Sequence, residues 1–478
     1  MTPQDFIALG PLLAVALGAV AALLSIGVRR RPRAAFAICG LGLAAGLAAI
    51  VPAWRVAPRA VTGLLVVDGY ALFFTGLVLA AAMAVLVLSA GYLRGRGEHA
   101  EEYCVLLMLA TLGACVLTAS THFASFFLGL ELLSVPLYAL MAYGRTQRPN
   151  IEAALKYLIL AGVSSAMLLM GMALVYADLG SLSFAHIFAD VAQSTEPMPW
   201  FLAGAALILT AVAFKLALAP LHFWAPDVYQ GAPAPVTAYV ATVSKGAVLA
   251  LALRYFGPLL AAGEPARVPL AFLAVASMFV GNLIALRQEN VKRLLAYSSI
   301  AHMGYLLVAL LAAPNAVTAV AFYLAAYFAT MLIALGVLVV LSRPGAEAQT
   351  LDDVRGLAWR RPWLAAAMTA ALLSLAGMPL TAGFFGKFYV LLAGSGAGLW
   401  GLVIVMVINS ALGLYYYLRV VAALFASAEQ PVPAAAPLVP LPWAGAVVLA
   451  ALVGVLVWLG TYPAPLIQMI RLLTAGAN

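Results

Sequence analysis

The sequence has very few charged residues for its length. Only 9% of its 478 residues are Asp, Glu, Lys or Arg, whereas a soluble domain carries about 25%. Hydrophobic residues make up 65% of the chain, and the mean hydropathy is +1.07. This composition excludes an ordinary soluble globule and predicts an all-α polytopic membrane protein. The net charge of +8 comes mostly from arginines in short loops between apolar runs, so no nucleic-acid partner is expected.

Cysteine is also scarce, and two common cofactor motifs are missing. Cys39, Cys104 and Cys115 lie in apolar runs, without a CxxC pair or a Cys/His spacing suited to metal. We interpret them as core residues. The sequence contains no GxxxxGK[ST] and no HExxH motif, so we expect no nucleotide, metal or redox cofactor in this chain. A pump built from it would have to receive its energy from a partner subunit.

Apolar runs of about 20 residues, the length needed to cross a hydrocarbon core of about 30 Å, recur along the chain. Fourteen such runs predict fourteen transmembrane helices. The seventh and twelfth runs are expected to be broken at membrane depth, near Pro220 and Pro379 respectively. The runs lie near residues 6–28, 34–53, 69–93, 103–120, 122–143, 151–177, 200–219, 235–256, 268–286, 294–312, 315–341, 362–393, 398–425 and 442–463.

Positive residues lie mainly in the loops that follow odd-numbered runs, such as 29–33, 287–293 and 355–361. The loops after even-numbered runs hold far fewer, among them Arg55 and Arg267. Because cytoplasmic loops carry the excess of Lys and Arg, the first set is expected on the cytoplasmic side. With an even number of helices, both termini are then expected on the opposite side of the membrane.

The placement of the five lysines is the strongest signal in the sequence. Lys292 lies in a short basic loop. The other four fall inside apolar runs: Lys156, Lys215, Lys245 and Lys387. A lysine at the centre of a membrane helix costs about 2.5–3.5 kcal/mol on insertion scales, so it is rarely left there without a use. A buried lysine also binds its proton less tightly, because a low-dielectric medium disfavours its charge. We predict that these lysines carry protons.

Glu131 is the only acid deep inside an apolar run. A nearby ammonium would keep its carboxylate charged, and the carboxylate would in turn hold a lysine protonated. A lysine whose partner moves away can then release its proton near neutral pH. We predict that Glu131 and Lys215 form such a switch. A static ion pair that only fixes helix packing is the alternative.

Matching spacings indicate an internal repeat. Glu131 precedes Lys215 by 84 residues, and His302 precedes Lys387 by 85. Each of the two lysines accompanies a proline-interrupted run. Two five-helix repeats, runs 4 to 8 and 9 to 13, would place the pairs at matching positions, and an odd number of helices makes the repeats inverted in topology. The predicted units are 1–100, 101–257, 266–425 and 440–478.

Three further residues are candidates for the same row of proton carriers. His302 and His222 are of the type that titrates near neutral pH and relays protons. A hydrogen-bonded core residue is the alternative interpretation of both, and the depth and counterpart position of His302 favour the relay there. Lys156 follows Glu152 by four residues, so an ion pair on one helix face is its alternative interpretation.

Five segments carry a family resemblance: LGLELLSVPLYAL, KYLILAGVSSAMLLMGMALVY, AFKLALAPLHFWAPDVYQGAPAPVTAYVATVSKGA, LLAYSSIAHMGYLL and GMPLTAGFFGKFYV. They resemble the antiporter-like membrane subunits of respiratory complex I over about residues 60–425. The resemblance implies a fourteen-helix, proton-translocating subunit of an NADH:quinone oxidoreductase in the inner membrane of a bacterium, with periplasmic termini.

The resemblance also implies roles for individual residues. In that family the span-5 glutamate pairs with the span-7 lysine, which here are Glu131 and Lys215. Lys245 corresponds to the central relay and Lys387 to the terminal proton-bearing group, while Lys156 matches a lysine in span 6. The resemblance further implies that NADH, FMN, iron–sulfur clusters and quinone are bound by partner subunits. The implied neighbours are another antiporter-like subunit, the small quinone-proximal membrane subunits, and lipids.

Two alternatives from other functional classes stay open. The first is a subunit of a multisubunit cation/proton antiporter, which shares this fold. A sodium site would need several oxygen ligands, and only Glu131 is deep. The second is a passive scaffold of the membrane arm, in which apolar replacement of the buried lysines would leave pumping unchanged.

Overall fold

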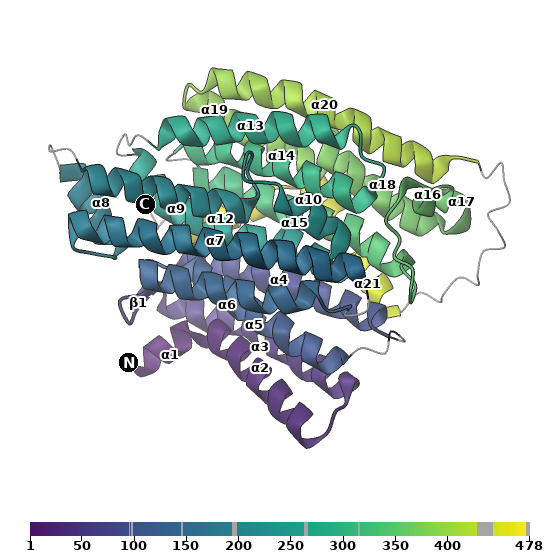
Figure 1. Ribbon diagram of the computed structural model, residues 1–478, viewed down its shortest axis with the longest axis horizontal. Helices are drawn as coiled ribbons and strands as arrows, with labels where there is room; N and C mark the ends of the chain where they lie inside the picture. The colour runs from purple at the N-terminus through teal and green to yellow at the C-terminus, as the bar shows by residue number, and fades with distance from the viewer. Residues whose placement is uncertain are drawn as a thin grey trace.

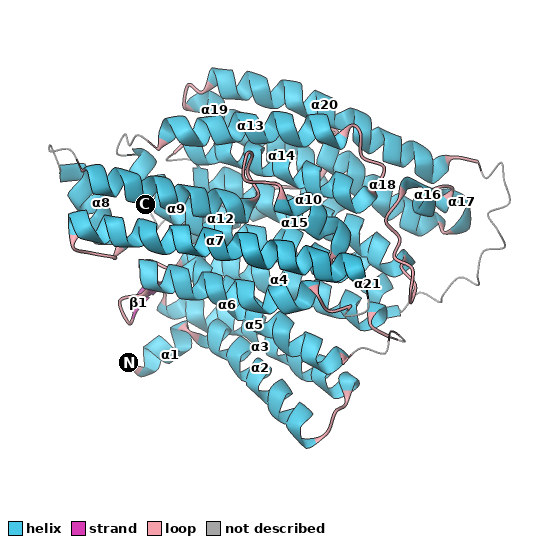
Figure 2. Cartoon of the chain, viewed as in Figure 1, coloured by secondary structure: helices cyan, strands magenta, loops and turns pink. Residues whose placement is uncertain are grey.

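The computed structural model describes residues 1–94, 96, 99–144, 147–193, 198–261, 266–313, 316–427 and 443–474. Within these ranges the regular structure is helical apart from one short hairpin (Figures 1 and 2). The hairpin joins β1 (Arg59–Val61) and β2 (Leu65–Val67) in antiparallel register. The expected start of the last unit, at residue 440, lies outside the described residues.

Thirteen helices in the described ranges are long and apolar enough to cross a membrane, which confirms the prediction of an all-α polytopic membrane protein. They are α2 (Gly10–Val28), α3 (Pro32–Val56), α4 (Gly69–Tyr92), α5 (Ala100–Ala119), α6 (Phe123–Met141), α7 (Arg148–Leu179), α9 (Pro199–Leu216), the continuous helix Ala234–Ala261, α13 (Arg267–Ala285), α14 (Val291–Leu311), α15 (Ala316–Leu341), α20 (Trp400–Phe425) and α21 (Trp443–Thr461).

The helix Ala234–Ala261 has three parts: α11 (Ala234–Tyr239), a π-helical turn η1 (Val240–Ser244) and α12 (Lys245–Ala261). The remaining helices are shorter. They are α1 (Pro3–Ala8), α8 (Phe184–Gln193), α10 (Trp224–Gly231), α16 (Leu351–Val354), α17 (Leu357–Arg360), α18 (Pro362–Ala376), α19 (Ala382–Gly396) and α22 (Ala464–Thr474).

The helices α9 and α18, like α7 at Gly180, end at residues with left-handed backbone. After α9, Ala217 has φ +58°, and Pro220 follows before α10 begins. After α18, Gly377 has φ +83°, and Pro379 follows before Thr381 caps the N-terminus of α19. A residue in the left-handed region turns the chain out of the helix, and a proline cannot donate the next helical hydrogen bond. Lys215 and Lys387 both lie next to these interruptions.

The helices lie side by side in a bundle. The most buried of them carry the candidate residues Lys245 and His302. The helix Ala234–Ala261, apart from its last turn, and α14 are surrounded by the rest of the protein, and α15 is largely so. In the helices α2, α3, α7, α20 and α21, most residues are partly or fully exposed. In Figure 1, α1 to α3 form one end of the molecule and α19 and α20 the opposite end. Polar groups on the central helices therefore face protein and not lipid.

Candidate functional site

Lys215 lies in the last turn of α9, with its side chain buried at 4% exposure. A cation is favourable there because the C-terminal end of a helix carries partial negative charge. Its Nζ donates a hydrogen bond to Ser134 Oγ of α6 at 2.8 Å. The same ammonium lies 5.4 Å from the centre of the Tyr157 ring on α7. The interruption after α9 thus leaves a lysine against the middle of two neighbouring helices.

Glu131 is partly buried on α6, one turn before Ser134. Its Oε1 accepts a hydrogen bond of 2.5 Å from Ser165 Oγ on α7. Residues three apart on a helix share a face, so Lys215 meets α6 one turn from Glu131, through a hydroxyl. The structure brings the two predicted partners to the same region of α6, where Lys215 is hydrogen-bonded to Ser134 and Glu131 to Ser165.

Lys245 is the first residue after the π-helical turn η1 and is 1% exposed. Its Nζ donates to Ser299 Oγ of α14 at 2.7 Å. The hydroxyls of Tyr229 and Tyr327 lie on the same Oγ, at 3.3 Å and 2.8 Å. π-Helical turns inside α-helices occur frequently at functional sites. Ser299 therefore joins the central lysine to tyrosines from α10 and α15.

His302 occupies the next turn of α14 and is 4% exposed. Its Nδ1 is 2.8 Å from the Tyr323 hydroxyl on α15, and its Nε2 is 3.1 Å from the Tyr417 hydroxyl on α20. Tyr417 is also hydrogen-bonded to Ser298. Both ring nitrogens are thus engaged by hydroxyls, which can either donate or accept.

Lys387 lies on α19 and is 7% exposed. Its Nζ donates to Ser410 Oγ of α20 and to the carbonyl oxygen of Ala376, both at 2.8 Å. Ala376 is the last residue of α18, where carbonyls have no partner inside the helix. The ammonium also lies 5.3 Å from the centre of the Tyr305 ring.

One face of α14 connects two of the predicted lysines. Ser299, His302 and Tyr305 are spaced by three residues, so they follow one another along a single helix face. Ser299 accepts from Lys245, and the Tyr305 ring lies beneath Lys387. A cavity of about 10 Å³, close to the smallest that holds a water molecule, lies between His302 and neighbouring residues of α15, α18 and α19.

In the described part of the chain, the other two candidates make no hydrogen bond to the lysines of this row. The Lys156 side chain is 44% exposed and forms ion pairs with Glu152 at 2.7 Å and Asp227 at 2.8 Å. The contact with Glu152 is the one that the four-residue spacing allows. His222, 5% exposed, follows α9 and stacks on Phe223 with ring centres 4.5 Å apart. Within the described part of the chain, its Nδ1 has no hydrogen-bond partner.

The sequence interpretation missed the hydroxyl that each buried lysine contacts. Ser134, Ser299 and Ser410 accept from Lys215, Lys245 and Lys387 respectively. The Tyr417 hydroxyl, bonded to His302 and Ser298, is a further group of this kind. The signal available in the sequence was the regular spacing of polar residues in AYSSIAHMGY.

Comparisons with known proteins assign the chain to a family. Residues 120–413 match the family described as NADH:quinone oxidoreductase/Mrp antiporter, TM. Over 475 residues the chain is 49% identical to NADH-quinone oxidoreductase subunit N of Methylococcus capsulatus (strain Bath), covering 98% of this chain and 95% of that one. The chain therefore belongs to the antiporter-like membrane subunits of this family. Within it, the chain is a homologue of subunit N of NADH-quinone oxidoreductase, which confirms the resemblance drawn from the motifs.

Solved structures show the same architecture. A chain of respiratory complex I from Thermus thermophilus with bound aureothin superposes with a TM-score of 0.81 at 36% identity, covering 96% of this chain and 98% of that one. A chain of the Mrp complex from Dietzia sp. DQ12-45-1b gives a TM-score of 0.87 at 21% identity, covering 100% and 98%. A chain of the archaeal membrane-bound sulfane sulfur reductase gives 0.83 at 23% identity, covering 99% and 97%. The last two likenesses concern the fold alone.

Proposed function

We propose that this chain is a membrane-arm subunit of a proton-translocating NADH:quinone oxidoreductase and carries protons along its buried lysines. Quinone reduction in partner subunits supplies the energy. The observation that carries the proposal is that Lys215, Lys245 and Lys387 all point their ammonium groups at hydroxyls inside the protein. Amines held in a low-dielectric interior on groups that donate and accept are suited to taking up and releasing protons.

In this proposal Glu131 controls the first lysine. When the carboxylate approaches Lys215 the ammonium is stabilised, and when it withdraws the proton is released. The position of Ser134, one turn from Glu131 on the same helix and bonded to Lys215, supports a short movement between the two arrangements. Ser165 gives the withdrawn carboxylate a hydrogen bond.

The second half of the path runs from Lys245 to Lys387 along α14. Ser299 and His302 supply the groups between them, with the Tyr323 and Tyr417 hydroxyls on the two ring nitrogens of His302. The four groups are contributed by α14, α15 and α20. We propose that Lys156 and His222 take part only at the periphery of the path, because neither shares a hydroxyl hydrogen-bond partner with the buried lysines.

Partner subunits bind NADH, FMN, the iron–sulfur clusters and quinone in this proposal. The solved relative at 36% identity is a chain of a whole respiratory complex I, so we place this chain beside other membrane-arm subunits and lipids. The likeness to a bacterial subunit N supports placing the chain in the bacterial inner membrane, and the distribution of positive charge supports periplasmic termini.

We also propose fourteen crossings, with α18 and α19 together forming the twelfth and α9 and α10 the broken seventh. Inverted repeats over 101–257 and 266–425, flanked by 1–100 and 440–478, are supported by two helix contacts. A Cβ added at Gly113 of α5 would meet Leu133 N and Gly129 O of α6 at 2.3 and 2.7 Å. A Cβ at Gly281 of α13 would meet Ala301 N and Tyr297 O of α14 at 2.6 and 2.7 Å.

These two contacts have the same residue spacing, so they set a register between the repeats. In that register Glu131 corresponds to Ser299, the partner of Lys245, and Ser134 corresponds to His302. The match inferred from spacing alone paired Glu131 with His302, about one helical turn away. The contact register is the one we adopt, because it rests on two helix pairs that pack backbone against backbone.

The test replaces Lys245 with Met in the assembled enzyme and measures protons translocated per NADH oxidised in proteoliposomes. Loss of translocation with intact assembly is expected. Normal translocation with intact assembly would refute the proposal for this residue and favour the passive scaffold. The cation/proton antiporter alternative is tested in the same preparation: translocation that requires Na⁺ would favour it, and translocation unchanged by Na⁺ removal is expected.

A further inference from the structure

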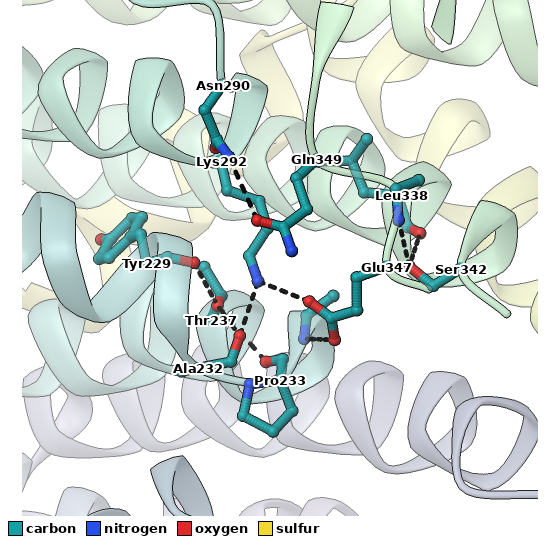
Figure 3. A network of polar contacts seen from close by, with 12 residues as sticks. Tyr229, Ala232, Pro233, Thr237, Asn290, Lys292, Leu338, Ser342, Glu347 and Gln349 are labelled. Carbon is teal, nitrogen blue, oxygen red and sulfur yellow. Dashed lines mark hydrogen bonds and ion pairs between the residues drawn. The ribbon is translucent and has the colours of Figure 1, made fainter. Parts of the chain in front are cut away.

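A buried ion pair lies outside the lysine row, between two segments that are far apart in the sequence. Lys292, near the start of α14, and Glu347, in the segment between α15 and α16, are joined at 2.9 Å with side chains 0% and 8% exposed. Figure 3 shows the Lys292 ammonium between the Glu347 carboxylate and the carbonyl of Ala232. Lys292 is expected from the sequence in a short basic loop, but it is the second residue of α14 and is fully buried.

The pair holds the corner between α10 and α11. Lys292 Nζ donates to the carbonyl of Ala232, the residue that follows α10, at 2.6 Å. Glu347 Oε1 accepts from the N–H of Ala234, the first residue of α11, at 3.1 Å. Cations are favoured at helix C-termini and anions at N-termini. Each charge therefore contacts the helix end that it stabilises.

The corner lacks two backbone donors, and its own hydrogen bonds include those from the Ala232 N–H to the Val228 carbonyl at 2.8 Å and from the Thr237 hydroxyl to the Tyr229 carbonyl at 3.0 Å. Its sequence is Ala-Pro-Ala-Pro, and Pro233 and Pro235 have no N–H. Tyr92 at the end of α4 gives the carboxylate of Glu347 a further hydrogen bond. The segment that carries Glu347 is itself tied to α14 by Val291 N–H to Gln349 O, at 2.5 Å. The ion pair is thus supported from α4, α11, α14 and the 342–350 segment.

The corner sets the position of two groups in the lysine row. Before it, α10 presents the Tyr229 hydroxyl to Ser299 Oγ. After it, the same continuous helix that begins at Ala234 carries Lys245, whose Nζ donates to that Oγ. A change in the angle of the corner would therefore move Tyr229 relative to Lys245.

We propose that Lys292 and Glu347 are positioning residues for proton transfer, which fix the α10–α11 corner and so hold Tyr229 and Lys245 together on Ser299. This inference rests on the proposed function. An ion pair suits the role because its hydrogen bonds are directional, whereas an apolar pair of the same volume often gives equal or greater stability without fixing orientation.

The experiment uses the assembled enzyme with Glu347→Gln, with Lys292→Met, and with both changes together. The double variant leaves no unpaired charge in the interior, so it tests the role even where a single variant fails to assemble. We expect the double variant to assemble normally and to translocate fewer protons per NADH oxidised. Glu289→Gln is the matched control, since its exposed side chain lies in the adjacent segment and should leave the ratio unchanged.

A double-mutant cycle separates positioning from general stability. Tyr229→Phe removes the hydroxyl through which the corner acts, so adding Glu347→Gln to it should lower translocation less than Glu347→Gln does alone. The inference is overturned if the losses caused by Tyr229→Phe and Glu347→Gln are fully additive. It is also overturned if the assembled variant with both Lys292→Met and Glu347→Gln translocates protons normally. If Lys245→Met leaves translocation normal, the proposed function fails. If Lys245→Met abolishes it while the Lys292/Glu347 variant pumps normally, only this inference fails.

Discussion

The ammonium of Lys387 caps the end of a helix to which it does not belong. It donates to the carbonyl of Ala376 at 2.8 Å, so the last residue of α18 is bound by a side chain from α19 across the interruption between them. The residue that makes this close approach possible is Gly377. A Cβ at that position would lie 2.8 Å from Lys387 Cδ.

Gly377→Ala should therefore impair the terminal lysine. The left-handed backbone at φ +83° costs a non-glycine residue about 1–2 kcal/mol, and the added methyl group displaces Lys387 from its two acceptors. We expect a lowered melting temperature and reduced protons per NADH. Gly398→Ala is the control, because Gly398 has φ +72° with nothing within 4 Å. Equal translocation by both variants would argue against the steric effect on Lys387.

Ser299→Ala should reduce translocation although it removes a single oxygen. Lys245 Nζ loses its acceptor at 2.7 Å, and a hydrogen bond to a charged group contributes about 1.5–3 kcal/mol. Subunit assembly and NADH-driven proton uptake are the measurements. Ser89→Ala removes another buried hydroxyl, which is bonded to the Val85 carbonyl and to Tyr103. A similar loss of pumping in that control would assign the effect to packing.

Acid should weaken the contact between Glu347 and Lys292. Burial raises the pKa of the Glu347 carboxyl, but Lys292, Tyr92 and the Ala234 N–H outweigh it and leave the pKa below its ordinary value of 4.5. The folded state thus binds this proton less tightly than the unfolded state. The stabilisation is complete above pH 4.5 and is lost as pH falls through the lower folded-state pKa. As the pH is lowered through this range, the melting temperature in detergent should fall less steeply for Glu347→Gln than for the unsubstituted chain.

Lys156→Met should lower translocation less than Lys215→Met. The Lys156 side chain is 44% exposed and paired with two acids, and such ion pairs contribute only about 0–1 kcal/mol. Lys215, buried against Ser134, has no such solvent access. Proton uptake by the two variants, normalised to assembled enzyme, makes the comparison. Equal losses would move Lys156 into the row.

Much of the fold could be predicted because bilayer crossing leaves a direct trace in the sequence. The helix over Ala316–Leu341 corresponds to a run expected at 315–341, and α20 to one expected at 398–425. The breaks were indicated by Pro220 and Pro379, and Gly377 is suited to a positive φ, but Ala217 carries no signal for a left-handed turn. Such a turn in a non-glycine residue is imposed by tertiary packing and not by local preference.

The candidate site was predictable where the cost of burial is large. A lysine in an apolar run stands out, and Lys215, Lys245 and Lys387 are all buried. Serine and tyrosine cost little in such a run, so Ser299 gave no comparable signal. Lys292 was missed for the opposite reason. Its neighbours in sequence are polar, and the acid that neutralises it comes from a segment 55 residues later.

The π-helical turn at Val240–Ser244 has a geometric consequence for the central lysine. Such a turn accommodates one residue more than an α-helical turn, and one residue corresponds to about 100° of rotation about the helix axis. If these five residues adopted regular α geometry, the two ends of the Ala234–Ala261 helix would twist against each other by that amount. The direction in which the Lys245 side chain extends therefore depends on the π-helical turn that directly precedes it.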